Sequence, residues 1–378
     1  MTHVLILQEY VPAYRVRFYE SLLDLARTNG IELTIAVGAP NEVRSRRGDA
    51  QSIAGVLELR QREFRLGGRR VVIRKTSQLI KDADLVIMEQ ARRNLDVYRL
   101  LIPRFARSTR IALWGHGRDY AHHPNRFEAW LLRQLTRRAD WFFGYTKAGV
   151  AAAIQAGIDQ SRSTVVMNAT DTSSLKTAMS NVTDSDKAAF IEAKALTHKT
   201  AIYIGGLDTI KRIPFLLECA ALAHALDSEF RLLIVGDGVD RNLVEAASSS
   251  DIGVVYLGPL FGAERALALS VAKVIAMPGA VGLVAVDSFA AGTPIVTTQW
   301  PLHGPEFDYL GDGRNAIVTE NTQHDYVTSL LRVLNSDDEL RNLRKSCLED
   351  ARIYTIENMT RNFMQGIGSA LEARGPSN

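Results

Sequence analysis

The residues with the clearest chemical potential lie at positions 276–296, in a segment that reads AMPGAVGLVAVDSFAAGTPIV. An apolar run is followed by small residues through Gly282, and a helix is predicted from near Leu283 to a stop at Gly292. Free backbone N–H groups at such a helix start form an anion site that suits phosphates. Asp287, about one turn into the helix, adds a carboxylate that can accept hydrogen bonds from sugar hydroxyls. The alternative is a packed strand, loop and helix with a solvated aspartate, and this segment alone leaves both interpretations open.

Two other ligand-binding patterns are absent. The first apolar run continues into QEYVPAYR, which has no Gly-x-Gly-x-x-Gly fingerprint. The stretch VGDGVD at 235–240 has two glycines after a predicted strand, but no third glycine and no Walker lysine follow. The sequence therefore argues against an NAD-binding protein and against a P-loop kinase.

No convincing metal site emerges from the acidic residues. Asp82 with Asp84, and Asp184 with Asp186, have the Asp-x-Asp spacing that some metal-dependent transferases use. The first pair precedes a strand that looks buried, and the second lies in a polar segment where aspartates cap helices. We therefore expect no bound metal.

Apolar runs alternate with helical patterns along the whole chain, which predicts a parallel α/β fold. The first half contains the predicted strands HVLILQ, ELTIAVG, ADLVIMEQ, RIALWGHG, WFFGYT and STVVMN. The second half contains the predicted strands TAIYIGG, FRLLIVGDG, GVVYLG, VAKVIAMPG, TPIVTT and NAIVT. Between the halves, residues 171–198 are polar and predict a linker followed by a short helix. Two such units joined by a linker make a cleft, with ligands at the carboxyl ends of the strands.

The predicted domains follow from this alternation. Residues 1–170 form an N-terminal Rossmann-like domain, and residues 171–358 form a linker with a second Rossmann-like domain. Residues 359–378 form a closing helix that is predicted to pack back toward the first domain. Helices are predicted at 17–29 and 126–138 in the first half, and near 213–226, 239–249, 263–270, 283–291 and 324–334 in the second.

Composition is typical of a soluble globular enzyme. The chain has 378 residues, of which 46% are hydrophobic and 23% are charged, so disorder and collagen-like repeats are excluded as overall descriptions. No run reaches the roughly 18 apolar residues of a membrane-spanning helix. The start MTHVLILQEY is interpreted as a first strand rather than a signal peptide. Two distant cysteines favour a reduced cytoplasm over a disulfide framework.

Charge is divided unevenly along the chain. Residues 1–170 carry 27 Lys and Arg against 16 Asp and Glu, a net charge of +11, whereas residues 171–378 carry −8. A basic half could contact nucleic acid, anionic lipid or a phosphorylated ligand, or it could simply present a solvated arginine-rich surface. The predicted helix 126–138 surrounds Trp130 with arginines and could lie on a membrane, although a helix that covers the sheet is the preferred interpretation.

Several motifs together resemble the family 4 glycosyltransferases of bacterial surface-polysaccharide type, which have the two-domain GT-B fold. The family pattern is Glu-Gly-Phe-Gly, four residues, Glu, and later Gly-Thr-Pro. This chain has Gly279-Ala280-Val281-Gly282, then Asp287, then SFAAGTP. Further stretches similar to family motifs are YIGGLDTIKRI, LLIVGDG with YLGPL, LHGPEFDYLGDGRN, LWGHG and VVMNATD, which together cover about residues 110–320.

The resemblance implies a donor site in the second domain. Lys211 matches the lysine that binds the donor diphosphate, and Asp287 matches the glutamate that holds the ribose. His116 matches a histidine near the transferred sugar, so His116 and Lys211 are the implied catalytic residues. The remaining implied donor-site residues are Gly206, Gly258, Pro259, Leu260, Gly282, Leu283 and Val284. A lysine and a helix N-terminus aimed at the leaving diphosphate would lower the barrier without a metal. A solvated surface lysine and a structural histidine in a glycine turn are the competing interpretations.

Three departures from the family pattern affect the donor site. Gly279 stands where the family has its first glutamate, and Gly206 stands where the family has an arginine on the phosphates. Asp287 is one methylene shorter than the family glutamate. Either neighbours such as Arg212 or arginines of the first half compensate, or donor binding is weak.

The first domain is expected to bind the acceptor through loops that follow its strands. The candidates are Tyr10, Tyr14, Arg15, Glu89, Gln90, Arg118 and Asp119. Glu89 or Asp119 could orient an acceptor hydroxyl at a hydrogen-bond distance of about 2.6–3.2 Å. The alternative is that these loops are polar connectors only.

The sequence therefore predicts a retaining, metal-independent glycosyltransferase of hexosyltransferase type. It would move a sugar from a nucleotide-sugar donor, UDP-linked by first choice and GDP-linked by second, to a glycan or polyprenyl-diphosphate-linked acceptor. The donor is a substrate, so no cofactor is expected, and no nucleic acid is an expected partner. The expected location is the cytoplasm, with peripheral contact to an anionic inner-membrane face. The alternatives are a non-catalytic GT-B nucleotide-binding subunit and a sugar-nucleotide epimerase.

Overall fold

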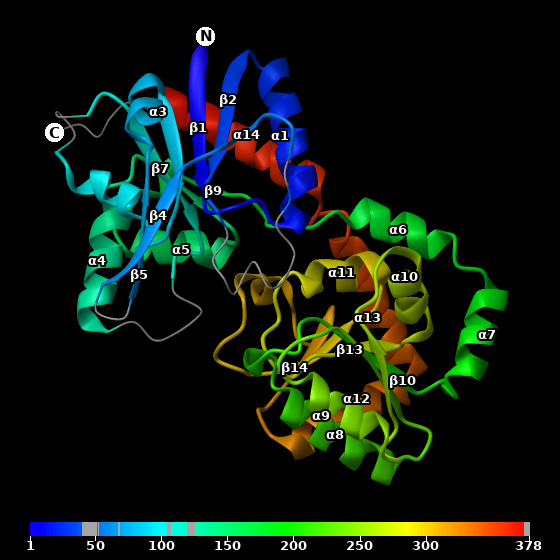
Figure 1. Cartoon of the computed structure of the whole chain (residues 1–378). Helices are drawn as coiled ribbons and strands as arrows, with labels where there is room; N and C mark the ends of the chain where they lie inside the picture. Colours follow the sequence, from blue (N-terminus) through cyan, green and yellow to red (C-terminus); the bar gives the residue numbers. More distant parts are fainter. Residues whose placement is uncertain (40–50, 52, 67–68, 104–106, 119–124, 374–378) are drawn as a thin grey trace. The chain divides into compact units, whose positions relative to one another are not determined.

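The computed structural model describes the chain except for residues 40–50, 52, 67–68, 104–106, 119–124 and 374–378 (Figure 1). Backbone contacts divide it into two units. Unit 1 comprises Met1–Thr170 with Ile356–Asn378, and unit 2 comprises Asp171–Thr355. Each unit contains a parallel sheet with helices on both faces, so the predicted pair of Rossmann-like units is confirmed.

Unit 1 is built on a parallel sheet with the strand order β3-β2-β1-β6-β7-β8-β9. These strands are β1 (Thr2–Gln8), β2 (Ile31–Val37), β3 (Val56–Glu58), β6 (Leu85–Glu89), β7 (Arg110–Gly115), β8 (Trp141–Gly144) and β9 (Ser163–Val165). The order runs outward from β1 in one direction and from β6 in the other. A topological switch point therefore lies between β1 and β6, and the carboxyl ends of these two strands are where such folds bind ligands.

Helices cover both faces of this sheet. On one face lie α1 (Val16–Thr28) and α14 (Ile356–Glu372), which pack side by side (Figure 1). On the other face lie α3 (Ser77–Asp82), η2 (Leu95–Leu101), α4 (Arg126–Arg137) and α5 (Lys147–Gln155). The short helices η1 (Ala13–Arg15) and η4 (Gln160–Arg162) complete the unit. Alternation along β1 supplies both layers, because Leu5 and Leu7 face the second set of helices.

An antiparallel hairpin, which the sequence analysis did not predict, joins β3 to α3. It consists of β4 (Gln61–Leu66) and β5 (Arg69–Arg74). Arginines interrupt the apolar alternation of this segment, which conceals its strand pattern. Two arginines attach the hairpin to the rest of unit 1: Arg70 pairs with Glu9 just after β1, and Arg74 Nε lies 2.9 Å from Oδ2 of Asp96 in η2.

Unit 2 repeats the same design with a parallel sheet of order β12-β11-β10-β13-β14-β15. The strands are β10 (Thr200–Ile204), β11 (Arg231–Val235), β12 (Val254–Gly258), β13 (Val274–Ala276), β14 (Ile295–Thr298) and β15 (Ala316–Thr319). All of them coincide with predicted strands. The switch point lies between β10 and β13, which places the loops 205–212 and 277–283 beside each other.

The described helices of unit 2 are more numerous than predicted, and the five predicted ones lie within about two residues of their expected bounds. They are α6 (Thr172–Ser180), α7 (Asp184–Ala193), α8 (Ile213–Leu226), α9 (Arg241–Ser248), α10 (Gly262–Val271), α11 (Val284–Ala291), α12 (Gln323–Leu334) and α13 (Asp337–Asp350), with short turns η5 (Thr209–Lys211) and η6 (Pro305–Tyr309). The expected linker contains two helices rather than one. Asp186 lies in a capping box with Thr183 at the start of α7, which is the capping role assigned to this acidic pair.

A cluster of aromatic rings attaches α14 to the rest of unit 1. Phe363 is fully buried, and its ring centroid lies 4.8 Å from that of Trp114, 4.5 Å from Phe143 and 5.4 Å from Phe18. In the sequence, α14 follows all of unit 2, yet it packs on the sheet of unit 1. These contacts therefore join segments more than 200 residues apart.

We expect Phe363→Ala to destabilise the protein by about 3–5 kcal/mol, because the substitution leaves a cavity among rings that cannot collapse. Urea unfolding of the full chain measures the loss. Phe261→Ala is the matched control, since Phe261 is 77% exposed and its removal should change stability little. Equal effects of the two substitutions would contradict the anchoring role of α14.

Candidate active site

The switch point of unit 2 brings the predicted donor residues together. The loop after β10 carries Lys211, and the loop after β13 leads into α11. The two loops are joined by a hydrogen bond of 3.0 Å from the Ala280 N–H to the Ile210 carbonyl. Lys211 Nζ also donates to the Ala280 carbonyl oxygen. The ammonium group is therefore held against the chain just before α11 begins.

Three consecutive backbone N–H groups lie at the start of α11. Within the described residues, the N–H groups of Gly282, Leu283 and Val284 have no hydrogen-bond acceptor, and no side chain caps the helix at Leu283. Unpaired amides at a helix start attract anions, and the adjacent Lys211 adds a full positive charge. This arrangement is chemically suited to a phosphate or diphosphate.

Gly279 has a steric reason to be glycine. A Cβ at this position would lie 2.4 Å from both the carbonyl carbon and the carbonyl oxygen of Lys211. Those atoms belong to the backbone and cannot move aside without shifting η5. The family's first glutamate is thus replaced here by close packing between the two loops, and the same packing positions Lys211.

Asp287 lies in the first turn of α11 and is paired with a residue that the sequence analysis missed. Arg265 of α10 places Nη2 at 2.5 Å from Asp287 Oδ2, and both side chains are largely buried. The Nε atom of Arg265 is buried without a hydrogen-bond partner in the described structure. Because a carboxylate accepts up to about four hydrogen bonds, pairing with Arg265 does not by itself exclude contacts with sugar hydroxyls. No local sequence pattern links Arg265 to Asp287, because the two residues meet only through the packing of α10 near α11.

The glycines of the neighbouring loops allow close backbone packing. A Cβ on Gly236 would lie 1.9 Å from the Gly205 carbonyl oxygen, and one on Gly238 would lie 2.7 Å from that of Leu207. At Gly206 the obstruction is only the Asp208 side chain, so the backbone alone does not require glycine there. Gly258 adopts φ +70°, and its carbonyl accepts the Gly236 N–H at 3.0 Å. The predicted base-contacting residues Pro259 and Leu260 follow it directly, between β12 and α10.

Arg212 was considered as a substitute for the arginine missing at position 206. Its guanidinium lies over the rings of Phe215 and Trp300, at 3.9 and 4.5 Å from the centroids. It also donates to the Pro278 carbonyl at 3.2 Å and to Asn321 Oδ1 at 2.5 Å. These contacts fix the turn before α8, where Arg212 adopts a left-handed φ of +58°. In this structure Arg212 therefore stabilises the loop after β13 through its hydrogen bond to the Pro278 carbonyl.

His303 also holds the loop between β13 and α11 in place. Its Nδ1 accepts the Val281 N–H at 3.0 Å, so Nε2 carries the proton that is donated to the Thr298 carbonyl at 2.9 Å. Burial lowers the pKa of His303 to about 4, and the charges of Lys211 and Arg212 add to the decrease. The sequence analysis noted the surrounding LHGPEFDYLGDGRN stretch but assigned no role to this histidine.

We predict that His303 makes the protein less stable in mild acid. Histidine in an unfolded chain titrates near pH 6.5, so between pH 6.5 and 4 the unfolded chain takes up a proton that the folded chain does not. Stability is therefore complete above pH 6.5 and falls by up to about 3 kcal/mol as the pH approaches 4. Urea unfolding at pH 7.5 and 5.0 should show a smaller loss for His303→Gln than for the wild type. Equal losses would contradict this prediction.

The switch point of unit 1 carries a paired set of charges. Glu9 follows β1 and Glu89 ends β6, and Arg93 bonds both, at 2.6 and 3.0 Å. Arg70 of the hairpin forms a second ion pair with Glu9. Glu9 is almost fully buried, whereas the Glu89 side chain keeps 21% of its surface exposed. Glu89 is thus the accessible carboxylate of a rigid network, which a group that orients a hydroxyl requires.

His116 follows β7 in a loop held by Gln90. The Gln90 side chain accepts the Gly117 N–H at 2.9 Å and donates to Thr136 Oγ1 at 3.0 Å. Gly117 adopts φ +75°, and a Cβ there would lie 2.0 Å from the Gly149 carbonyl oxygen. His116 is exposed and its ring packs edge-on against Tyr145, at 4.5 Å between centroids. Gln90 therefore has a clear structural role in this loop.

The other predicted acceptor residues differ in exposure. Arg15 is buried, and its guanidinium lies 5.0 Å from the ring centroid of Trp114 and 5.2 Å from that of Tyr145. Tyr14 is 43% exposed, Tyr10 is half-buried and Arg118 is exposed. Asp119 lies outside the described residues.

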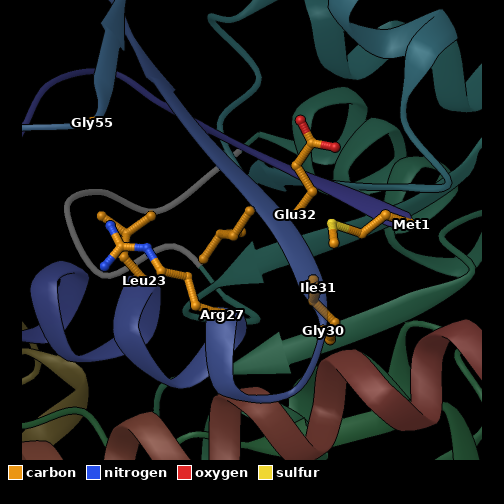
Figure 2. Close-up of a pocket in the computed structure, with 8 residues that line it drawn as sticks. Met1, Leu23, Arg27, Gly30, Ile31, Glu32 and Gly55 are labelled. Carbon is orange, nitrogen blue, oxygen red and sulfur yellow. The ribbon is translucent and has the colours of Figure 1, made fainter.

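A hollow of about 400 Å³ occurs elsewhere in unit 1 (Figure 2). Met1, Glu32 and Gly55 contribute to its lining. Because Met1 precedes β1 and Ile31 begins β2, this hollow lies at the amino ends of the strands. Parallel α/β sheets bind ligands at the opposite edge, so we do not assign the hollow to the active site.

Part of unit 2 is similar to a known protein family. Residues 198–336, all in unit 2, match the family model "Glycosyl transferases group 1". No curated protein matches the chain in sequence.

Solved structures match the whole chain. Anabaena Alr3699/HepE in complex with UDP has 14% identity and a TM-score of 0.70, covering 98% of this chain and 100% of its own. Sucrose-phosphate synthase from Thermosynechococcus elongatus has 13% identity and a TM-score of 0.68, covering 99% and 100%. The lipopolysaccharide outer core galactosyltransferase WaaB has 16% identity and a TM-score of 0.65, covering 97% and 99%. The chain therefore has the GT-B fold, and its second unit contains the segment that matches the group 1 glycosyltransferase model.

We expect Asp287→Asn to weaken UDP binding about tenfold to a hundredfold, because a charge-assisted hydrogen bond is worth about 1.5–3 kcal/mol. Asp287→Glu should retain most of the affinity, since it preserves the carboxylate. Titration calorimetry of both variants provides the measurement.

Asp287→Asn also weakens the ion pair with Arg265, so the substitution should be repeated in a variant that lacks this arginine. Asp287→Asn should weaken binding by a similar factor in a chain that already carries Arg265→Leu. If the effect disappeared in that background, Asp287 would act only by holding Arg265, and its ribose contact would be wrong.

Proposed function

We propose that this protein is a glycosyltransferase that uses a nucleotide-sugar donor, with a UDP-sugar as first choice and a GDP-sugar as second. The observation that carries the proposal is the set of unpaired amides at Gly282, Leu283 and Val284 beside Lys211. These groups lie inside the segment that matches the group 1 glycosyltransferases. The similar HepE structure contains UDP, and a second one contains UDP-glucose, which favours uridine.

The donor diphosphate would bind at the start of α11, with Asp287 toward the ribose and Gly258, Pro259 and Leu260 toward the base. As the glycosidic bond breaks, negative charge develops on the diphosphate oxygens. Lys211 and the helix amides are already oriented toward that charge, so little reorganisation accompanies the reaction. These groups make a metal unnecessary for stabilising the leaving group. No cluster of metal-ligating side chains occurs among the described residues.

The transfer is proposed to retain the anomeric configuration by a front-face mechanism. The acceptor hydroxyl oxygen bonds to the anomeric carbon on the face from which the diphosphate departs, and a diphosphate oxygen takes the hydroxyl proton. His116 is proposed to lie near the transferred sugar. On the acceptor side, Glu89 is the best-positioned carboxylate, because Arg93 and Asn94 fix it at a strand end.

The acceptor is proposed to be a glycan or a polyprenyl-diphosphate-linked saccharide in bacterial polysaccharide or glycoconjugate assembly. WaaB, a galactosyltransferase of the lipopolysaccharide outer core, is among the similar structures and supports this class. A cytoplasmic protein in peripheral contact with the inner membrane face fits such an acceptor. None of the described helices is both long and apolar enough to cross a bilayer.

A non-catalytic nucleotide-binding subunit is the second candidate. Gly279 favours it, because the position of the family's sugar-contacting glutamate is filled by the Lys211 backbone. A panel of UDP-, GDP-, ADP- and TDP-sugars, assayed for hydrolysis and transfer with calorimetry beside it, separates the two. Turnover of one donor, undiminished by excess chelator, supports the metal-independent enzyme. Nucleotide binding without turnover favours the subunit, and epimerised donor would indicate the epimerase.

We predict that Lys211→Ala lowers transfer about tenfold to a hundredfold and leaves the fold intact. The loss of a charge-assisted contact to the leaving group costs about 1.5–3 kcal/mol, and each 1.4 kcal/mol is tenfold in rate. Initial rates at subsaturating donor measure the effect. Lys187→Ala is the control, since Lys187 lies on α7 and pairs only with its neighbour Asp184 in the described structure. An unchanged rate for Lys211→Ala would contradict its assignment.

A further inference from the structure

The exposed apolar side chains of unit 1 gather on three neighbouring elements. These elements are the β4–β5 hairpin, η2 and α4, and we call their outer surface the hairpin–α4 face. It carries the exposed residues Phe64, Ile73, Leu95, Leu101, Ile102, Phe127 and Trp130. Elsewhere in the described part of unit 1, large exposed apolar residues are few: Met1, Tyr14 and Leu57. An exposed gathering of this kind marks an interaction site rather than ordinary surface.

Helix α4 contributes an aromatic pair that faces solvent. Phe127 is 65% exposed and Trp130 is 54% exposed, and their rings stack with centroids 5.9 Å apart. The helix buries its opposite side, where Leu135 enters the core. Tryptophan and phenylalanine normally bury most of their surface, so this pair awaits a partner that is at least partly apolar.

The hairpin contributes a second apolar strip by strand alternation. Arg70, Val72 and Arg74 point inward, since Arg70 pairs with Glu9, Val72 is buried and Arg74 pairs with Asp96. Their neighbours along the strand must point outward. Phe64 lies opposite Val71 in the register, and Arg62 lies opposite Ile73, so these four share the outer side.

The three elements form a continuous surface. Strand β5 packs on η2, and η2 packs on α4. The Val72 N–H donates to the Arg93 carbonyl at 2.8 Å, which attaches the hairpin directly before η2. Leu95 and Leu101 are six residues apart in a 3₁₀ helix with three residues per turn, and they therefore share one side.

Charge on this surface is predominantly positive. Exposed arginines lie near Trp130 along α4 at helical spacings of four, three and seven residues, namely Arg126, Arg133 and Arg137. The hairpin adds exposed Arg62, which lies on the outer side opposite Ile73. Each of the three acidic residues on these elements already contacts an arginine of unit 1: Glu63 with Arg70, Asp96 with Arg74 and Glu128 with Arg92. The uncompensated charge is thus cationic.

We propose that the hairpin–α4 face docks on an anionic lipid bilayer. The arginines would pair with lipid phosphates while Trp130, Phe127 and Phe64 enter the interfacial region, where aromatic side chains are favoured. A set of exposed aromatic and arginine side chains spread over three elements matches an anionic bilayer surface in both apolar character and charge. The inference names the surface for the membrane contact in the proposed function but rests only on these residues. Lipid binding and sugar transfer can therefore fail separately.

The first experiment is cosedimentation of the full chain with vesicles. Vesicles that contain one-third phosphatidylglycerol should bind the protein at low salt, and pure phosphatidylcholine vesicles should bind it poorly. Each arginine near an anionic surface is worth about 1 kcal/mol, or about fivefold in partitioning, and salt screens it. Binding should therefore fall steeply between 50 and 500 mM salt. No binding to the anionic vesicles at low salt would overturn the proposal.

Matched variants locate the surface. Phe127→Ser with Trp130→Ser, Phe64→Ser with Ile73→Ser, and Arg126→Glu with Arg133→Glu should each lower partitioning at least tenfold. Leu226→Ser with Leu348→Ser removes exposed apolar residues from unit 2, and Arg17→Glu with Arg27→Glu reverses charges on α1. These controls should retain binding. Melting temperatures verify that every variant folds.

Two outcomes would assign the face to another partner or to none. Equal losses in the variants and the matched controls would show that only net charge matters, which contradicts a defined face. Concentration-dependent self-association that Phe127→Ser with Trp130→Ser abolishes, without any vesicle binding, would assign the face to a second copy of the chain. Transfer to a water-soluble acceptor should stay unchanged in all the variants, because none of them lies in the proposed donor or acceptor site.

Discussion

The candidate donor site depends on the close approach of two loops at the switch point of unit 2. Strands β10 and β13 are neighbours in the sheet although about 70 residues separate them in the chain. Their loops meet where Gly279 presses against the Lys211 backbone, with no room for a side chain between them. This contact aligns an ammonium group with the open amides of α11. His303 and Arg212 then hold the same loop, through Val281 and Pro278.

Two departures from the family pattern have different physical origins. At Gly279 the Lys211 backbone leaves no space for a side chain, so close packing of the two loops occupies the position of the glutamate in the resembled pattern. At Gly206 only a movable side chain intervenes, and glycine there is not required by the fold. The guanidinium of Arg265 pairs with Asp287 and adds a positive charge to this region. The charge of the site is thus distributed differently from the family arrangement.

Sequence reasoning identified most strands of the two parallel sheets and singled out the loop before α11, because both depend on local patterns; the short strand β3 was not predicted. Buried parallel strands are continuous apolar runs, and the Gly282–Leu283 junction combines a small-residue loop with a helix start. Arg265 and His303 were missed because their roles arise from helices and loops that meet only in space. The hairpin was missed because its inward positions include Arg70 and Arg74, whose charges are compensated by Glu9 and Asp96 from distant segments. Paired buried arginines resemble surface residues in a sequence.

The excess positive charge of the first half separates into two populations once the contacts are known. Arg70, Arg74 and Arg93 are internal, and their charges hold the hairpin and the strand ends of β1 and β6 in place. Arg126, Arg133 and Arg137 remain exposed around Trp130. A net charge alone cannot distinguish a structural network from a docking surface, because both contribute equally to +11. The ion pairs of the acidic residues make the distinction. Where the acidic residues pair with other arginines, the charges of the remaining exposed arginines are not neutralised and create a positive potential at the surface.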